Sequence, residues 1–129
     1  MTHGQEERAN LDLVRAMYEA VLMPMNAEAV DAYFRADYIQ HSPLAADGRE
    51  ALKSFLRGAK QRNPDCAHIL KRIFADGDRV ICHVHVVLKP DTPGLAVVDI
   101  FRVQDGLIAE HWDVAQPVVV DGPNKNGMF

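Results

Sequence analysis

Histidine and aspartate side chains gather at alternating positions in the last third of the 129-residue chain. His83 and His85 are two residues apart, Asp99 follows them, and His111 and Asp113 flank a tryptophan. In a β-strand, residues two apart lie on the same face of the sheet. Burying an unpaired polar group costs about 1 to 3 kcal/mol, so we interpret this concentration as a functional site rather than ordinary packing.

Three helices are expected in the first half of the chain. Apolar residues recur every three or four positions over residues 6–22, which is typical of an amphipathic helix. Asn26 resembles the N-cap of a second helix, and residues 37–41 are expected to form a short extended segment. A third helix is expected over residues 48–61, with Asp47 as its cap.

The second half of the chain is expected to form strands separated by turns, at residues 69–75, 79–88, 95–103 and 107–117. Helices followed by a strand meander are typical of an α+β fold in which helices cover one face of a curved antiparallel sheet. A chain of this length is expected to form one domain, residues 1–129. Its ordered core is expected over about residues 5–118, and the tail at 119–129 is expected to be loose.

The turn at residues 105–106 decides which side chains share a face, because a slip of one residue moves every side chain to the other face. A two-residue turn would place Asp99 opposite Trp112, whereas a three-residue turn with a left-handed Gly106 would place Asp99 opposite His111. We favour the three-residue turn. It gathers the oppositely charged Arg102 and Glu110 on one face and leaves on the other face Asp99, Phe101, His111 and Asp113.

Composition excludes several classes of protein. The hydrophobic fraction of 48% and the charged fraction of 25% are typical of a water-soluble globular protein, and no apolar run approaches the roughly 18 residues of a membrane span. The polar N-terminus lacks the features of a secretory signal, so a cytoplasmic location is expected. A net charge of −4 with scattered basic residues argues against nucleic-acid binding. Cys66 and Cys82 lack CxxC spacing and are expected to be reduced.

Two segments resemble a known family. The sequence VVDIFRVQDGLIAEHWDV at 97–114, together with YIQHSP at 38–43, closely resembles the SnoaL-like branch of the ketosteroid-isomerase and nuclear-transport-factor-like superfamily. The resemblance extends from the first helix to Pro117. It implies a cone, in which three helices close against a strongly curved sheet and a ligand cavity lies in the wide end. It also implies a homodimer that works without a cofactor or metal.

The resemblance implies roles for individual residues. Enzymes of these families move a proton next to a carbonyl, either in aldol cyclisation or in a double-bond shift. Asp99 falls where the isomerases carry a protonated aspartic acid that binds the oxyanion, and Tyr18 falls near their oxyanion tyrosine. His41 is at or beside the position of their general-base aspartate, so imidazole replaces carboxylate there. His111 and Asp113 match the HWD element of the cyclase-like branch, where an acidic residue is the proposed acid or base.

The leading hypothesis is therefore a cofactor-independent enzyme acting on a small hydrophobic or carbonyl-containing ligand. His41 or His111 would remove an α-proton, and the enolate would be held by Asp99, Tyr18 or His85. The expected catalytic residues are His41, Asp99, His111 and Asp113, and the expected ligand-contacting residues are Tyr18, His83, His85 and Phe101.

Two alternatives remain open. The same fold serves as a non-catalytic ligand-binding or dimerisation module, and titratable groups converging on a cavity of roughly 300 Å³ or more would favour an enzyme over that alternative. A metal site built from histidines and a carboxylate is chemically possible, although no HxxxH or HExxH spacing supports it.

The outer face of the sheet is expected to form the dimer contact. That face would otherwise expose Val84, Val86, Ile100 and Trp112. His68, which precedes the first strand of the meander, is expected at the surface.

Overall fold

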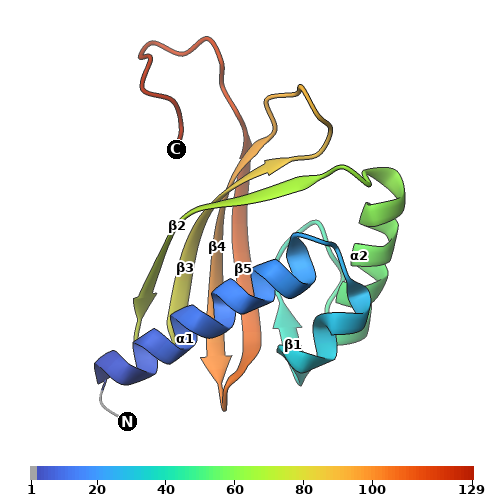
Figure 1. Ribbon diagram of the computed structural model, residues 1–129, viewed down its shortest axis with the longest axis vertical. Coiled ribbons are helices and arrows are strands. Elements are labelled where there is room, and N and C mark those ends of the chain that lie inside the picture. The colour runs from blue at the N-terminus through green and yellow to red at the C-terminus, as the bar shows by residue number, and fades with distance from the viewer. Residues whose placement is uncertain (1–2) are drawn as a thin grey trace.

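Helices pack against one side of a curved sheet in the computed structural model, which describes residues 3–129 (Figure 1). The helical elements are α1 (His3–Met17), η1 (Tyr18–Leu22), η2 (Ala27–Ala32) and α2 (Arg49–Arg62). The strands are β1 (Phe34–Gln40), β2 (Ala67–Asp76), β3 (Arg79–Val87), β4 (Leu95–Gln104) and β5 (Leu107–Pro117). This order of elements confirms the α+β prediction.

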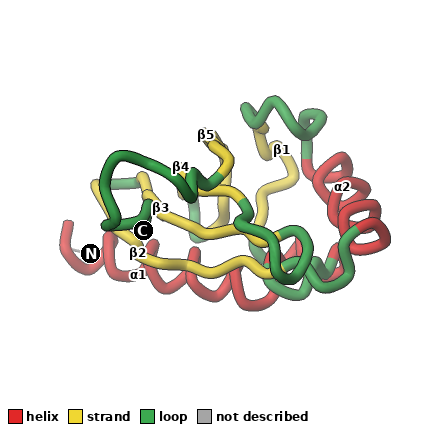
Figure 2. The backbone as a smooth tube through the Cα atoms, turned by 90° about the horizontal axis from the view of Figure 1, so that it is seen from above, coloured by secondary structure: helices red, strands yellow, loops and turns green. Residues whose placement is uncertain are grey.

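The sheet has the order β1-β5-β4-β3-β2. Strands β2 to β5 form an antiparallel meander, but β1 pairs in parallel with β5, so the predicted antiparallel sheet is in fact mixed. A parallel pair needs a long connection, and α2 with the first three strands of the meander supplies it. Seen from above, the strands curve from β2 round to β1, with α1 along β2 and α2 beside β1 (Figure 2).

The first predicted helix ends in a widened turn. The segment η1 is a π-helix, in which the Met23 amide donates to the Tyr18 carbonyl five residues earlier at 2.8 Å. Tyr18 lies at the junction of α1 and η1 and is fully buried. Such π turns often occur at functional sites.

The two helix caps predicted from the sequence differ in outcome. Asn26 caps η2, because its side chain accepts from the Glu28 amide at 3.1 Å. Asp47 does not cap α2, since its carboxylate accepts from the Gln40 amide at 2.7 Å. Gly48 occupies the N-cap position of α2 without a side-chain hydrogen bond.

The register of β4 and β5 differs from both predicted registers. Gln104 faces Leu107 across a two-residue turn, and one extra residue, Ala109, then bulges out of β5 before Glu110 pairs with Arg102. The bulge sets Asp99 opposite Asp113 and Phe101 opposite His111. The preferred three-residue turn was wrong. The predicted sharing of faces is nevertheless observed, because one extra residue in the bulge shifts the alternation of β5 side chains as one extra residue in the turn would have done.

The hydrophobic core lies between the helices and the concave face of the sheet. Val84 is fully buried in this core and Val86 packs against it, so the prediction that both line the outer face was wrong. Ile100 and Trp112, which face each other on β4 and β5, do lie on the outer face. Within residues 3–129, no helix combines the length and apolar character needed to cross a bilayer.

Candidate active site

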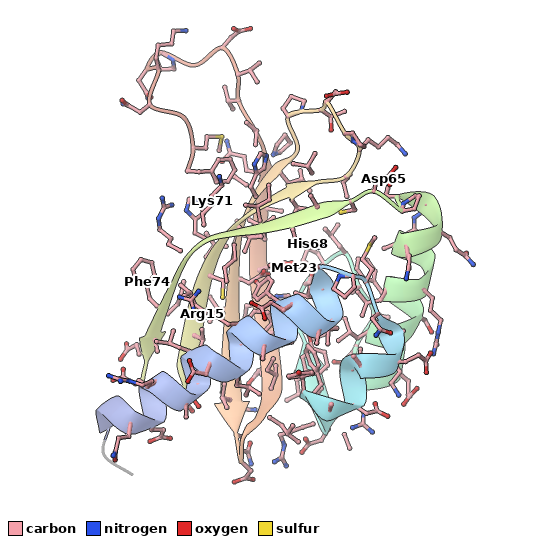
Figure 3. The ribbon with its side chains drawn as sticks, viewed as in Figure 1. Arg15, Met23, Asp65, His68, Lys71 and Phe74 are labelled. Atoms are coloured by element: carbon pink, nitrogen blue, oxygen red, sulfur yellow. The ribbon has the colours of Figure 1, made fainter. Side chains whose placement is uncertain are left out.

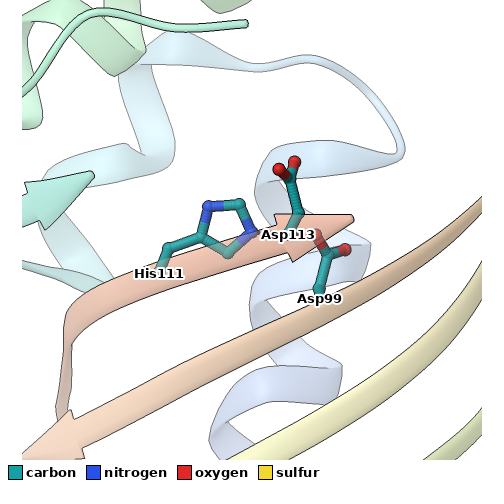
Figure 4. A group of neighbouring side chains, drawn as sticks. All are labelled: Asp99, His111 and Asp113. Atoms are coloured by element: carbon teal, nitrogen blue, oxygen red, sulfur yellow. Dashed lines mark hydrogen bonds and ion pairs between the residues drawn. The ribbon is translucent and has the colours of Figure 1, made fainter. Parts of the chain in front are cut away.

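A cavity of about 190 Å³ lies between the concave face of the sheet and the helices. Most of its lining is apolar, contributed by both helical and strand residues. Polar side chains are concentrated on the wall that β1, β4 and β5 form, namely Tyr38, Gln40, Ser42, Asp99, His111 and Asp113. Four of the expected site residues, Asp99, Phe101, His111 and Asp113, therefore line one cavity, and Figure 4 shows the three polar ones.

Asp99 is the centre of a buried hydrogen-bond chain. One carboxylate oxygen, Oδ2, accepts from the Tyr18 hydroxyl, and the other, Oδ1, lies 2.8 Å from Nε2 of His111. Both Asp99 and His111 are 8% exposed. Burial, together with the neighbouring Asp99 carboxylate, holds the pKa of Tyr18 well above its ordinary value, so the hydroxyl keeps its proton.

Gln40 fixes which nitrogen of His111 carries a proton. Its Oε1 accepts from the backbone amide of Ser42 at 3.0 Å, so this atom is the amide oxygen and not the nitrogen. The same Oε1 lies 2.7 Å from Nδ1 of His111, which must therefore be the donor. If the imidazole is neutral, its Nε2 has a lone pair and Asp99 must supply the proton between them. If Asp99 is ionised, the imidazole must be protonated, so the pair shares one proton in either form.

Asp113 is the carboxylate of this wall without a hydrogen bond to any other described residue. It stands opposite Asp99 on the neighbouring strand, and one ligand atom from each of Asp99, His111 and Asp113 lies within 4.8 Å of the others. Phe101 supports the arrangement, because its ring stacks on His111 with centroids 4.7 Å apart. The wall thus combines a hydrogen-bonded Asp99 with an unpaired Asp113.

Tyr38 and Gln40 were missed in the sequence. They alternate with Ser42 along β1 and beyond it, so all three side chains line the cavity. The Tyr38 hydroxyl accepts from Gln40 Nε2 at 2.9 Å, and its own proton has no acceptor among residues 3–129. Burial raises the pKa of Tyr38, so the hydroxyl remains a donor available to a ligand.

His41 does not line the cavity, contrary to its expected role as a base there. Its position between Gln40 and Ser42 turns the imidazole to the outer face, where it stacks on Trp112 with centroids 5.0 Å apart. Its Nε2 lies 2.7 Å from Oε2 of Glu110, and Oε1 of the same carboxylate accepts from Arg102 Nε at 2.8 Å. We refer to His41, Arg102, Glu110 and Trp112 as the outer-face cluster.

His83 and His85 also lie on the outer face. They alternate with Cys82, Val84 and Val86, whose side chains point inward. Each makes a local contact, because His83 Nδ1 hydrogen-bonds Arg72 and His85 Nε2 lies 2.7 Å from the Pro93 carbonyl oxygen. The ring of Phe129, in the segment after β5, stacks on His85 with centroids 4.4 Å apart. Neither histidine is placed where a ligand in the cavity could touch it.

His68 lies at the cavity rather than at the surface. It pairs with Val86 across β2 and β3, and both line the cavity. The signal that could have found it is the inward face of Val86, since paired residues on neighbouring strands share a face. Burial lowers the pKa of His68, and the negative charge of Asp99 opposes this effect only in part.

The outer-face cluster predicts a pH dependence of stability. The hydrogen bond from His41, together with Arg102, holds the pKa of Glu110 below its ordinary value of 4.5. Ionised Glu110 therefore adds stability above about pH 4.5, and this contribution is lost as the pH falls through the folded-state pKa. In Glu110→Gln, the free energy of unfolding should therefore fall less between neutral and acid pH than in wild type. The difference should be less than about 1 kcal/mol, because water screens the ion pair. Urea unfolding of both proteins at the two pH values measures this, and an equal fall in both proteins would contradict it.

A family model of a SnoaL-like domain matches residues 14–111 of the chain. The matched range contains Tyr18, Asp99 and His111 and ends two residues before Asp113. None of the curated proteins compared with the sequence matches it.

Solved structures share the fold at low sequence identity. TsrD from Streptomyces laurentii is 21% identical with a TM-score of 0.69, and the match covers 84% of this chain and 89% of that one. A candidate polyketide cyclase from Bacillus cereus is 18% identical with a TM-score of 0.74, over 86% and 76% of the two chains. A candidate ketosteroid isomerase from Kribbella flavida is 22% identical with a TM-score of 0.70, over 94% and 87%.

At such identities the solved structures show a common fold and no more. The family model covers most of the chain, and its match agrees with helices closed against a curved sheet. The chain therefore belongs to the SnoaL-like family.

Proposed function

We propose that this protein catalyses proton transfer next to a carbonyl group in a small apolar ligand, without a cofactor. The observation that carries the proposal is the unpaired carboxylate of Asp113, which faces the hydrogen-bonded Asp99 and His111 on one wall of the cavity. A carboxylate next to hydrogen-bond donors is the combination that enolisation needs, because one group takes the proton and the others hold the oxyanion.

The roles follow from the hydrogen bonds. Asp113 takes the proton as the α C–H bond breaks, and the electron pair moves onto the carbonyl oxygen. The Tyr38 hydroxyl, whose proton has no acceptor among residues 3–129, is the donor for that oxygen. The pair formed by Asp99 and His111 can donate its proton to the oxygen only when the hydrogen bond within the pair opens. Tyr18 donates to Asp99 and orients it. Returning the proton to another carbon gives isomerisation, whereas attack of the enolate carbon on a second carbonyl gives aldol cyclisation.

The size and lining of the cavity limit the ligand. Its volume of about 190 Å³ lies below the roughly 300 Å³ that would favour an enzyme by size, so the support for catalysis is the convergence of titratable groups alone. The apolar lining favours a flat hydrocarbon body, and the polar wall accommodates one carbonyl. A bicyclic aromatic ketone such as 1-tetralone has this shape and carries exchangeable α-protons.

Hydrogen–deuterium exchange at the α-carbon of 1-tetralone tests the proposal. We expect the wild-type protein in D2O to accelerate the exchange, followed by proton NMR, well above the rate in buffer alone. If the protein binds the ketone but exchange is no faster than in buffer alone, catalysis is contradicted and the alternative of a ligand-binding module is favoured. This measurement needs no knowledge of the natural substrate.

A metal site is the second candidate function. Asp99, His111 and Asp113 could each offer one ligand atom. Gln40 would orient the imidazole by accepting from Nδ1, as hydrogen-bond acceptors behind metal-bound histidines do. A cation would have to replace the contact between His111 Nε2 and Asp99. Titration calorimetry with Zn²⁺ distinguishes the two functions. Micromolar or tighter binding that Asp113→Asn abolishes would favour the metal site.

The outer face of the sheet is the proposed dimer contact. Val98 and Val114, which pair across β4 and β5, are 39% and 74% exposed beside Ile100 and Trp112. A dimer would cover these apolar side chains. Size-exclusion chromatography with light scattering tests this, and a monomer at all concentrations would contradict it. The cytoplasmic location stays a prediction.

A further inference from the structure

We propose that His68 is a second polar contact for the ligand, at the end of the cavity remote from Asp99. The substrate would then be a flat apolar ketone that carries a hydroxyl or second carbonyl far from the enolised one. This inference rests on the proposed function for the identity of the ketone end, and it extends that function by specifying the class of substrate.

The sheet register separates His68 from the polar wall. Asp99 pairs with Cys82 on β3, and the next inward residues along β3 are Val84 and Val86. His68 on β2 is the partner of Val86. It therefore lies two strands across the sheet from Asp99 and two inward-facing positions further along it. Figure 3 shows His68 on the side of β2 that faces Met23 and the helices, whereas Lys71 lies on the other side.

The imidazole of His68 has no hydrogen-bond partner among residues 3–129. Its Nδ1 is a buried nitrogen that meets no hydrogen-bond partner among the described residues. Such an atom costs folding free energy, and native proteins generally pair it with a protein group, water or a ligand. Because burial lowers the pKa of His68, the ring is neutral at physiological pH and has one N–H donor and one lone pair.

The neighbours of His68 favour an uncharged partner. Asn63 and Cys66 line the same cavity near the start of β2, and neither carries charge. Burial raises the pKa of the Cys66 thiol, so it stays neutral as well. Between this end and the polar wall, the inward residues Val86 and Val97 are apolar. A ligand with a polar group at each end and an apolar middle matches this sequence of surfaces.

A pair of probes isolates the contact with His68. 1-Tetralone carries only the ketone, whereas 6-hydroxy-1-tetralone adds a hydroxyl at the far end of the same bicycle. We expect the wild-type protein to bind the hydroxyl probe about tenfold more tightly than 1-tetralone, because the cavity-lining imidazole of His68 gains a hydrogen bond that no residue among 3–129 supplies. Long-range ¹H–¹⁵N spectra should show the imidazole nitrogens of His68 shifting with the hydroxyl probe only.

Variants of two histidines complete the experiment. His68→Leu should bring the ratio of the two dissociation constants close to one, whereas His68→Gln should retain much of the preference because an amide still donates and accepts. His83→Leu, a matched change on the outer face, should leave the ratio unaltered. A ratio that His68→Leu does not change, or no binding of either probe to wild type, would overturn the proposal.

The binding measurement also separates this inference from the proposed function. A protein that binds the hydroxyl probe through His68 but does not exchange α-protons would contradict catalysis and leave the second contact standing. A protein that exchanges α-protons of both probes equally well, with equal affinities, would support catalysis and contradict the role of His68.

Discussion

Replacing Asp113 with asparagine is expected to lower the rate of α-proton exchange of 1-tetralone by a factor of about 10² to 10⁴. Asparagine has nearly the shape of aspartate but cannot accept a proton at neutral pH. The hydrogen bonds of Asp99 to Tyr18 and His111 do not involve Asp113, so the rest of the polar wall should keep its geometry. Exchange rates of wild type and variant, measured by proton NMR at equal protein concentration, give the factor directly.

Glu110→Gln is the matched control for the Asp113 variant. Glu110 also lies on β5, but its carboxylate bonds to His41 and Arg102 on the outer face. Its replacement should leave the exchange rate within about twofold of wild type. Equal losses in both variants would indicate a general effect of carboxylate removal, and an active Asp113→Asn variant would remove Asp113 from the reaction.

Asp99→Ala is expected to reduce the free energy of unfolding by about 2 to 6 kcal/mol. The substitution leaves two buried groups without a partner, the Tyr18 hydroxyl and Nε2 of His111, and each costs about 1 to 3 kcal/mol. Urea unfolding at neutral pH, followed by the fluorescence of the single tryptophan and at one protein concentration, measures the loss.

Asp99→Asn tests the hydrogen-bond assignment behind this number. Because Gln40 keeps the proton of a neutral His111 on Nδ1, an asparagine amide can donate to Nε2 and still accept from Tyr18. This variant should lose less than about 1 kcal/mol. Losses as large as those of Asp99→Ala would mean that the pair needs the charge of Asp99 rather than a shared hydrogen bond.

The sequence pattern predicts the elements of this fold well, because hydrophobic periodicity and turn residues act locally. The strands predicted at 79–88 and 95–103 lie within one residue of β3 and β4. The direction of β1 could not be predicted in this way. Its parallel pairing with β5 depends on how the whole chain between them folds back, and no local pattern records that.

The face of each strand was harder to predict than its position. His41 was predicted from the family resemblance, and His83 and His85 were predicted from their alternation in a strand. The residues that face the cavity or the core are instead their sequence neighbours on both segments. Apolar burial decided the faces, since the inward positions of β3 carry Cys82, Val84 and Val86. His68 was missed for the same reason. Val86 was assigned to the outer face, and His68 shares the face of Val86 because the two residues pair.

Asp99 and His111 were placed on one face for a reason that was partly wrong. The expected three-residue turn does not form, and Ala109 supplies the extra residue as a bulge inside β5 instead. A bulge has no strong sequence signature, so its presence in β5 could not be predicted from the sequence. The resemblance to the SnoaL-like family predicted that Tyr18 contacts the ligand. Tyr18 is not among the residues that line the cavity, but its hydroxyl donates to Asp99, a contact that spacing alone could not predict.

A crystal structure with 1-naphthol bound tests the central claim most directly, because this phenol is a flat mimic of the enol of 1-tetralone. The account predicts that naphthol lies in the cavity with its oxygen within hydrogen-bond distance of Tyr38 or Asp99, and with the adjacent ring carbon facing Asp113. Naphthol bound only on the outer face, beside His83 and His85 or against Trp112, would contradict the account.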